Sequence, residues 1–148
     1  MAIKLKKILA PTDLSKLSRA AVAYALDLAR ERGAQVLVYH VIDEEGYWSD
    51  NDAWLNPAAA LIPRQREQLR EFMREHFTDM LDAANISEIV EMGVPYNKIV
   101  QKAEEEDADM IVMSTHGRTG FEQILLGSVT AKVVARAPCP VLSIRPPR

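Results

Sequence analysis

A glycine-bearing stretch in the C-terminal third has the residue types needed to bind phosphate. An apolar run over 110–113 leads into Ser-Thr-His-Gly-Arg at 114–118, and Gly-Ser-Val-Thr at 127–130 opens the next amphipathic segment. Glycine lets the backbone approach an anion closely, and the N–H groups at a helix start point toward it. Ser128 could cap that helix, offer its hydroxyl to a phosphate, or do both. The pattern predicts a buried strand, an anion-binding loop and a helix.

Two standard nucleotide signatures are absent from the sequence. A P-loop requires a lysine between its second glycine and the following Ser or Thr, whereas Gly127 is followed directly by Ser128. A dinucleotide fingerprint requires several glycines after the first strand, and residues 10–13 read Ala-Pro-Thr-Asp. The sequence therefore excludes a P-loop NTPase and a typical NAD enzyme.

The remaining reactive side chains suggest binding rather than catalysis. Asp13 follows the first strand, where it could face a ligand or cap the next helix. His116 in the glycine loop could contact phosphate or remain solvated. His40 lies within an apolar strand, which favours a hydrogen-bonded structural role. His, Cys, Asp and Glu residues show no metal-site spacing, and Cys139 between two prolines has no neighbouring base. We therefore predict no catalytic residue and no protein-held metal.

Strands and helices alternate along the chain, which predicts an α/β fold of order βαβαβαβαβ. Expected strands cover 3–10, 35–42, 86–92, 108–113 and 141–144, and expected helices cover 17–32, 63–84, 95–103 and 128–136. Such alternation favours a mainly parallel sheet with helices on both faces. Ligands bind at the carboxyl ends of strands where the winding reverses. If strands one and four are neighbours there, residues 11–13 face residues 114–120.

The connection between the second strand and the second helix is long. Residues 43–62 contain Gly46, Pro57 and three aromatic residues, which predicts a flexible loop, either a mobile surface segment or a lid. No linker or internal repeat divides the chain, so we predict one domain over residues 1–148.

Bulk composition narrows the class of protein further. The chain has 148 residues, 48% of them hydrophobic and 26% charged, with a net charge of −3. This charge gives no basic face for nucleic acid. One cysteine suits a reducing compartment, and no apolar run approaches the length of a membrane span. We expect a cytoplasmic protein.

Four separated motifs together resemble the universal stress protein family. They are Ala-Pro-Thr-Asp at 10–13, His-Val at 40–41, the glycine loop with its helix start, and Pro-Cys-Pro-Val-Leu at 138–142. The resemblance spans essentially the whole chain. It implies a Rossmann-like, five-stranded parallel sheet and a homodimer. One branch binds ATP through G-x-x-G, nine residues, G-[ST]; here Gly117, Gly127 and Ser128 match, and Ser114 replaces the first glycine.

The resemblance to the ATP-binding branch also implies a set of ligand contacts. Adenine would lie near Asp13 and Val41, in a pocket lined by Pro11 and Thr12. Ribose and phosphates would lie along Met113, Ser114, Gly117 and Arg118. The phosphates would be held by Gly127, Ser128, Val129 and Thr130. A divalent ion, Mg²⁺ or Mn²⁺, could bridge the phosphates, because such ions often bind through substrate oxygens.

We therefore expect an ATP-binding stress-response regulator rather than an enzyme, because no residue is a convincing base for hydrolysis. Two alternatives remain open: a dimeric adaptor of the same fold that binds no nucleotide, and a slow ATPase. The apolar strand at 141–144 should form a sheet edge, and pairing with a second copy would cover it. We expect the homodimer to form there.

Overall fold

A computed structural model of the chain describes residues 3–46, 57–82, 85–116 and 126–146. These residues form a five-stranded sheet in the order β3-β2-β1-β4-β5, in which every pairing is parallel. The strands are β1 (Lys7–Pro11), β2 (Gln35–Asp43), β3 (Asn85–Gly93), β4 (Met110–Ser114) and β5 (Val141–Ile144). The α/β fold expected from the sequence is confirmed.

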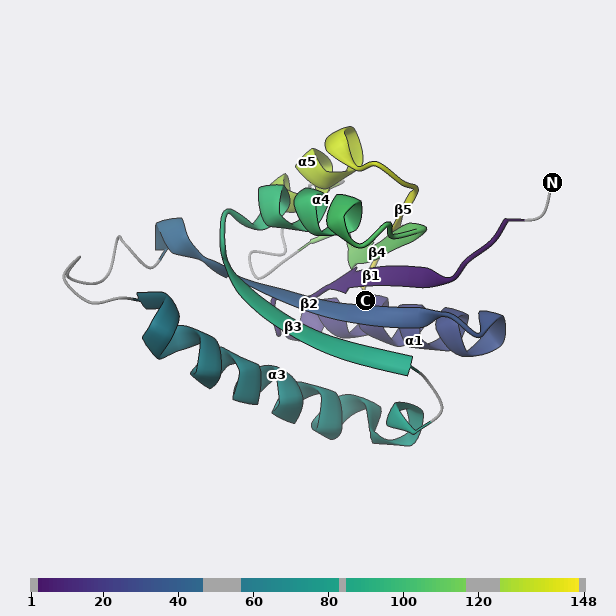
Figure 1. The fold of residues 1–148 in the computed structure, drawn as a ribbon, viewed down its shortest axis with the longest axis horizontal. Coiled ribbons are helices and arrows are strands. Elements are labelled where there is room, and N and C mark those ends of the chain that lie inside the picture. The colour runs from purple at the N-terminus through teal and green to yellow at the C-terminus, as the bar shows by residue number, and fades with distance from the viewer. Residues whose placement is uncertain (1–2, 47–56, 83–84, 117–125, 147–148) are drawn as a thin grey trace.

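Helices cover both faces of the sheet (Figure 1). They are α1 (Arg19–Arg32), α3 (Pro57–Leu81), α4 (Pro95–Glu105) and α5 (Ser128–Arg136), with a 3-10 turn at Lys16–Ser18 before α1. Helices α1 and α3 lie on one face, and α4 and α5 lie on the other. Each face has its own apolar core, since alternate strand residues point to opposite sides. No helix among the described residues is long and apolar enough to cross a membrane.

Strand β1 lies at the centre of the sheet, between β2 and β4. Ile8 pairs with Val36 on one side and with Met110 on the other. The carboxyl ends of β1 and β4, at Pro11 and Ser114, are therefore neighbours, as the sequence predicted. The chain winds outward in opposite directions from this pair of strands, so a ligand site is expected between their carboxyl ends. The outer strands are β3 and β5, and the position of β5 confirms the sheet edge predicted at 141–144.

The largest errors in the predicted element boundaries are the starts of the first strand and of the second helix. The first strand begins at Lys7 rather than residue 3, since pairing with β2 starts there and Ile3 is 80% exposed. Helix α3 begins at Pro57, and Pro63 lies inside it. Proline suits a helix start at either position, but the turn before Pro63 also packs Leu61 and Ile62 on the core. The expected 43–62 loop is thus shorter, and its residues 47–56 lie outside the described residues.

The ends of α1 and the start of α5 differ in how they are capped. Gly33 ends α1 with φ of 64°, in the left-handed conformation that glycine adopts without strain. Ser15 precedes the 3-10 turn but makes no side-chain cap, and Asp13 instead accepts the Ser15 N–H at Oδ1. Gly127 is the N-cap of α5, so Ser128 is the first helical residue and not the cap.

Candidate nucleotide-binding site

The turn after β1 is held by a continuous chain of hydrogen bonds. Leu14 N–H donates to Thr12 Oγ1 at 3.0 Å, and Thr12 Oγ1 lies 2.7 Å from Ser18 Oγ. Ser18 Oγ donates to the Ser15 carbonyl at 2.8 Å, so its single proton is used there and Thr12 is the donor between the two hydroxyls. Leu14 has φ of 64°, which is costly for a residue with a side chain. The hydrogen bonds stabilise this strained turn and fix the position of Asp13.

The end of β4 and the start of α5 are tied together across the intervening loop. Thr130 Oγ1 donates to the Ser114 carbonyl at 2.8 Å, and Gly127 N–H donates to the Thr115 carbonyl at 2.7 Å. Thr115 N–H in turn donates to the Ile144 carbonyl of β5 at 3.0 Å. The first turn of α5 is therefore held against the carboxyl end of the sheet.

The N-terminus of α5 has the features of an anion site. Ala131 N–H donates to the Gly127 carbonyl and begins the helical ladder, so the N–H groups of Ser128, Val129 and Thr130 have no acceptor within the helix. Gly127 has no side chain with which to cap them, and the first turn contains no acidic residue. Ser128 is exposed beside these groups. A phosphate fits here, because it would accept the N–H groups and interact favourably with the helix dipole.

Ser114 joins the two halves of the site. Its hydroxyl lies 2.8 Å from the His116 carbonyl and 3.2 Å from the Leu17 carbonyl, and its one proton can be donated to either. Leu17 belongs to the turn that follows Asp13. The turn after β1 thus lies beside residues 114–116, as the sequence predicted, whereas residues 117–120 of the predicted loop lie outside the described residues.

Several predicted contact residues are more buried than a ligand-lining role requires. Met113 is 5% exposed and packs in the core beneath α4 and α5, and Val41 packs against the same core. Pro11 and Thr12 are also buried. Their side chains pack in the protein interior, whereas their backbones lie near the carboxyl ends of β1, β2 and β4. The Thr130 hydroxyl has its proton committed to Ser114, so towards a phosphate it could only accept.

Two predicted site residues, Gly117 and Arg118, lie outside the described residues. Just before them, His116 Nδ1 lies 2.9 Å from Thr115 Oγ1. The predicted contacts of Gly117 and Arg118 with ribose and phosphates stay predictions.

The structure also shows supporting residues that the sequence did not reveal. Ser18 and Leu17 hold the turn and the β4 loop, and Gln65 of α3 reaches His40. The expected hydrogen-bonded role of His40 is confirmed. A serine five residues after Asp13 was a weak sequence signal for a turn, but nothing in the spacing of Gln65 indicated its partner.

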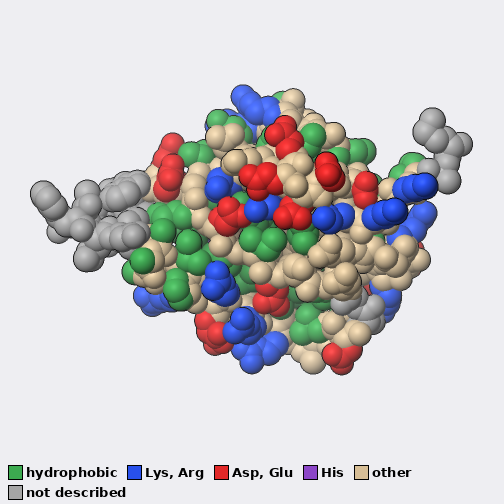
Figure 2. Space-filling model, viewed as in Figure 1, with side chains coloured by type: hydrophobic (Ala, Val, Ile, Leu, Met, Phe, Trp, Pro, Cys, Tyr) green, Lys and Arg blue, Asp and Glu red, His purple; other side chains and the backbone are tan. Residues whose placement is uncertain are grey.

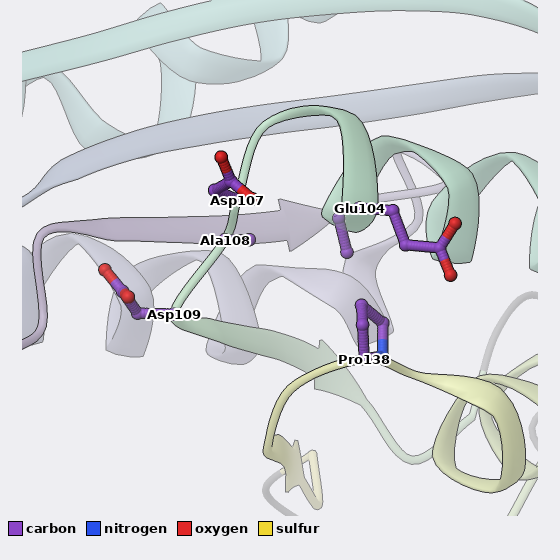
Figure 3. Close-up of a pocket in the computed structure, with 6 residues that line it drawn as sticks. Glu104, Asp107, Ala108, Asp109 and Pro138 are labelled. Carbon is purple, nitrogen blue, oxygen red and sulfur yellow. The ribbon is translucent and has the colours of Figure 1, made fainter.

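A separate hollow lies at the other end of β4 (Figure 3). Its lining includes Glu104, Asp107 and Asp109, but their carboxylates point in different directions and do not converge. Asp109 Oδ2 already accepts the N–H groups of Lys6 and Lys7 at 2.8 and 3.0 Å. Burial raises the pKa of the nearby Cys139 thiol, and Asp109 adds to this effect. This hollow therefore has neither a converging ligand set nor an activated thiol.

Charge is mixed on the face of the molecule shown in Figure 2. Lys and Arg side chains alternate there with Asp and Glu among the described residues, and they form no broad patch of one sign. This distribution agrees with the net charge of −3 and gives no support for a nucleic-acid interface on that face.

Comparison with known proteins identifies the family. The sequence profile of the Universal stress protein family matches residues 4–145. The chain belongs to this family. Universal stress protein MJ0531 of Methanocaldococcus jannaschii is 36% identical over 152 residues, which cover 97% of this chain and 84% of that protein. Universal stress protein MJ0577 of the same organism is 29% identical over 160 residues, covering 98% of each.

Solved structures of universal stress proteins share the fold. Universal stress protein UspA from Lactobacillus plantarum superimposes with a TM-score of 0.82 at 26% identity, covering 97% of this chain and 100% of the other. The structure of MJ0577 superimposes with a TM-score of 0.77 at 30% identity, covering 99% of both chains. The five-stranded sheet described above is thus the fold of the universal stress protein family.

Proposed function

We propose that this universal stress protein is an ATP-binding regulatory module whose nucleotide occupancy controls its assembly or its binding to a partner. The observation that carries the proposal is the split site. A rigid turn presenting Asp13 lies beside the Ser114 loop, which leads to a helix start with three backbone N–H groups that have no acceptor within the helix. In this arrangement the nucleoside would lie at the turn and the phosphates at the helix start.

Structures of the same fold support an adenine nucleotide as the ligand. One is a universal stress protein in complex with cAMP, at 23% identity and a TM-score of 0.63. Another, from Archaeoglobus fulgidus, is a complex with dAMP, at 24% identity and a TM-score of 0.57. At these identities the likeness shows only a shared fold, but it supports the idea that this fold accommodates adenine nucleotides.

In the proposed complex, the chain's own residues bind and orient the ligand. Asp13 and the backbone near Val41 would face adenine, and the first turn of α5 would hold the phosphates, with Gly127 allowing close backbone approach. The described residues contain no group of three or more His, Cys, Asp or Glu placed to hold a metal. A Mg²⁺ or Mn²⁺ ion would therefore be bound through phosphate oxygens and water. We propose no catalytic residue.

The proposed assembly is a homodimer through β5. Ile111 of β4 donates its N–H to the Pro140 carbonyl, and Thr115, just after β4, donates its N–H to the Ile144 carbonyl. Because alternate residues of a parallel strand bond to a given neighbour, Val141 and Ser143 direct their backbone polar groups to the free edge. An antiparallel second copy of β5 would satisfy these groups with two-fold symmetry.

The test is ATP binding by calorimetry, preceded by chromatography of any nucleotide released from the denatured protein. Gly127 has φ of −64° and ψ of 164°, values that valine tolerates, so Gly127→Val should fold while its branched side chain blocks the phosphates. Asn97→Val places the same side chain on an exposed position in the first turn of α4 and serves as the control.

We expect wild type and Asn97→Val to bind ATP alike and Gly127→Val to lose most of its affinity. Equal binding by all three would refute the phosphate site. A folded wild type that binds no ATP would favour the adaptor, for which Ser114 in place of the motif glycine is the supporting observation. Release of inorganic phosphate in proportion to bound ATP would instead favour the slow ATPase.

A further inference from the structure

His40 is a buried polar side chain on an otherwise apolar face of β2. It is 4% exposed and points to the same side of the sheet as Val38 and Ile42, which belong to the core under α1 and α3. A polar ring in such a place is costly unless its nitrogens are hydrogen-bonded. Both nitrogens are engaged, and their partners come from different elements.

The first partner of His40 is the backbone of the turn after β1. Nδ1 lies 2.9 Å from the Thr12 carbonyl oxygen. A carbonyl can only accept, so Nδ1 carries the hydrogen and donates it. Thr12 is also the residue whose hydroxyl receives the Leu14 N–H and contacts Ser18. His40 is therefore hydrogen-bonded to Thr12, whose hydroxyl makes the hydrogen bonds that stabilise the turn.

The second partner comes from helix α3. Nε2 lies 3.0 Å from Oε1 of the Gln65 side-chain amide. In the neutral ring with hydrogen on Nδ1, Nε2 is an acceptor, so this hydrogen bond forms when the Gln65 amide is turned to place its NH₂ group where Oε1 lies. Gln65 thus fixes the ring in the plane from which Nδ1 reaches Thr12. The contact links α3 to the turn that presents Asp13.

We infer that His40 is a positioning residue for the nucleotide site, holding the turn after β1 through Thr12 while Gln65 orients its ring. The inference rests on the proposed function, since it assigns His40 to the purine half of that site. His40 does not touch the ligand; it acts through the backbone that carries Thr12 and Asp13.

Two substitutions separate the partners of His40. The side-chain amide of asparagine reaches about as far as Nδ1, so His40→Asn keeps a donor for Thr12 and loses Gln65. The longer glutamine reaches about as far as Nε2, so His40→Gln keeps the α3 contact and loses Thr12. Each variant removes one buried hydrogen bond, so both should lower the melting temperature by similar amounts.

ATP affinity should distinguish the two variants where stability does not. We expect His40→Gln to weaken ATP binding about tenfold, the equivalent of one net hydrogen bond, and His40→Asn to stay within about twofold of wild type. Equal weakening in both variants, or none in either, would overturn the positioning role.

Amide hydrogen exchange of the nucleotide-free protein keeps this inference separable from the proposed function. In His40→Gln the Leu14 and Ser15 amides should exchange faster than in wild type or His40→Asn, because their acceptors, Thr12 Oγ1 and Asp13 Oδ1, lie in the turn. Unchanged exchange in His40→Gln would overturn the Thr12 contact itself. Failure of wild type to bind ATP would overturn the proposed function, and the site role of His40 with it, whatever the exchange result.

Discussion

Ser128→Asp should make the protein more stable and a poorer ATP binder at the same time. Ser128 is exposed, is the first residue of α5 and has no acidic neighbour in that turn. A carboxylate there interacts favourably with the helix dipole but repels the phosphates that we place at the same N–H groups. A purely structural role for this helix start predicts only the gain in stability.

The two magnitudes can be estimated separately. A negative charge in the first turn contributes about 0.3–1 kcal/mol, which raises the melting temperature of a chain this size by roughly 1–4 °C. Two unit charges 4 Å apart repel by about 1 kcal/mol in bulk water. Because Ser128 is exposed, the bulk-water value applies to a carboxylate at this position. Two nearby phosphate charges then give a repulsion of about 2 kcal/mol. The expected loss of affinity is roughly 30-fold.

Calorimetry with ATP and thermal unfolding of nucleotide-free protein measure the two effects. Asn97→Asp adds the same charge to the exposed first turn of α4, which also lacks acidic residues, and is the matched control. It should gain similar stability and keep its affinity for ATP. The Ser128→Asp defect should shrink at high salt, because exposed charges are screened. Undiminished ATP affinity in Ser128→Asp, with the stability gain present, would refute the placement of the phosphates at α5.

Three further predictions concern the assembly and the scaffold. Ser143→Pro removes a backbone donor from the free edge of β5 without disturbing the bonds to β4. If the proposed dimer forms there, light scattering should show a dimer for wild type and Ser143→Ala and a monomer for Ser143→Pro; an unchanged dimer mass would exclude this edge as the interface. Burial raises the pKa of Glu91, but ion pairs with Lys102 and Lys98 outweigh it and hold that pKa below its ordinary 4.5. Glu91→Gln should therefore lower the free energy of unfolding by about 1–2 kcal/mol at neutral pH, and the deficit should vanish as the pH falls from 4.5 through the lowered pKa; a deficit that persists in acid would contradict this. Gly33→Ala should lower the free energy of unfolding, measured by chemical denaturation, by about 1 kcal/mol, because φ at this position is 64°. The cost is not steric, since a Cβ there meets no atom within 4 Å. An unchanged free energy of unfolding would contradict the expected backbone strain.

Local signals were sufficient to predict much of the fold. The bounds of α5 and β5 were predicted correctly, because Gly127 precedes the apolar pattern of α5 and Pro138 separates that pattern from the apolar run of β5. The buried strand at 110–114 and the winding reversal beside β1 followed from apolar runs and regular alternation. The start of α3 could not be predicted from local signals. Pro57 and Pro63 are equally good helix starts, and only packing on the core distinguishes them.

The candidate site was predictable at the level of segments but not of contacts. Gly127 and Asp13 carry motifs that indicate which loops should meet. Two hydrogen bonds depend on how elements far apart in sequence pack. One joins His40 to Gln65, and the other joins the Thr130 hydroxyl to the Ser114 carbonyl. Sequence periodicity assigns a face to each residue, but it does not say which polar group on a neighbouring element will satisfy it.

A nitrogen-edited NMR titration with ATP, adenosine and tripolyphosphate tests the split site most directly. ATP should shift the amide signals of both halves, residues 12–15 and 128–130, along a single binding curve. Adenosine should shift only the first set and tripolyphosphate only the second. If ATP shifts the amide signals of only one half, or of neither half, the nucleotide is not held between β1 and α5.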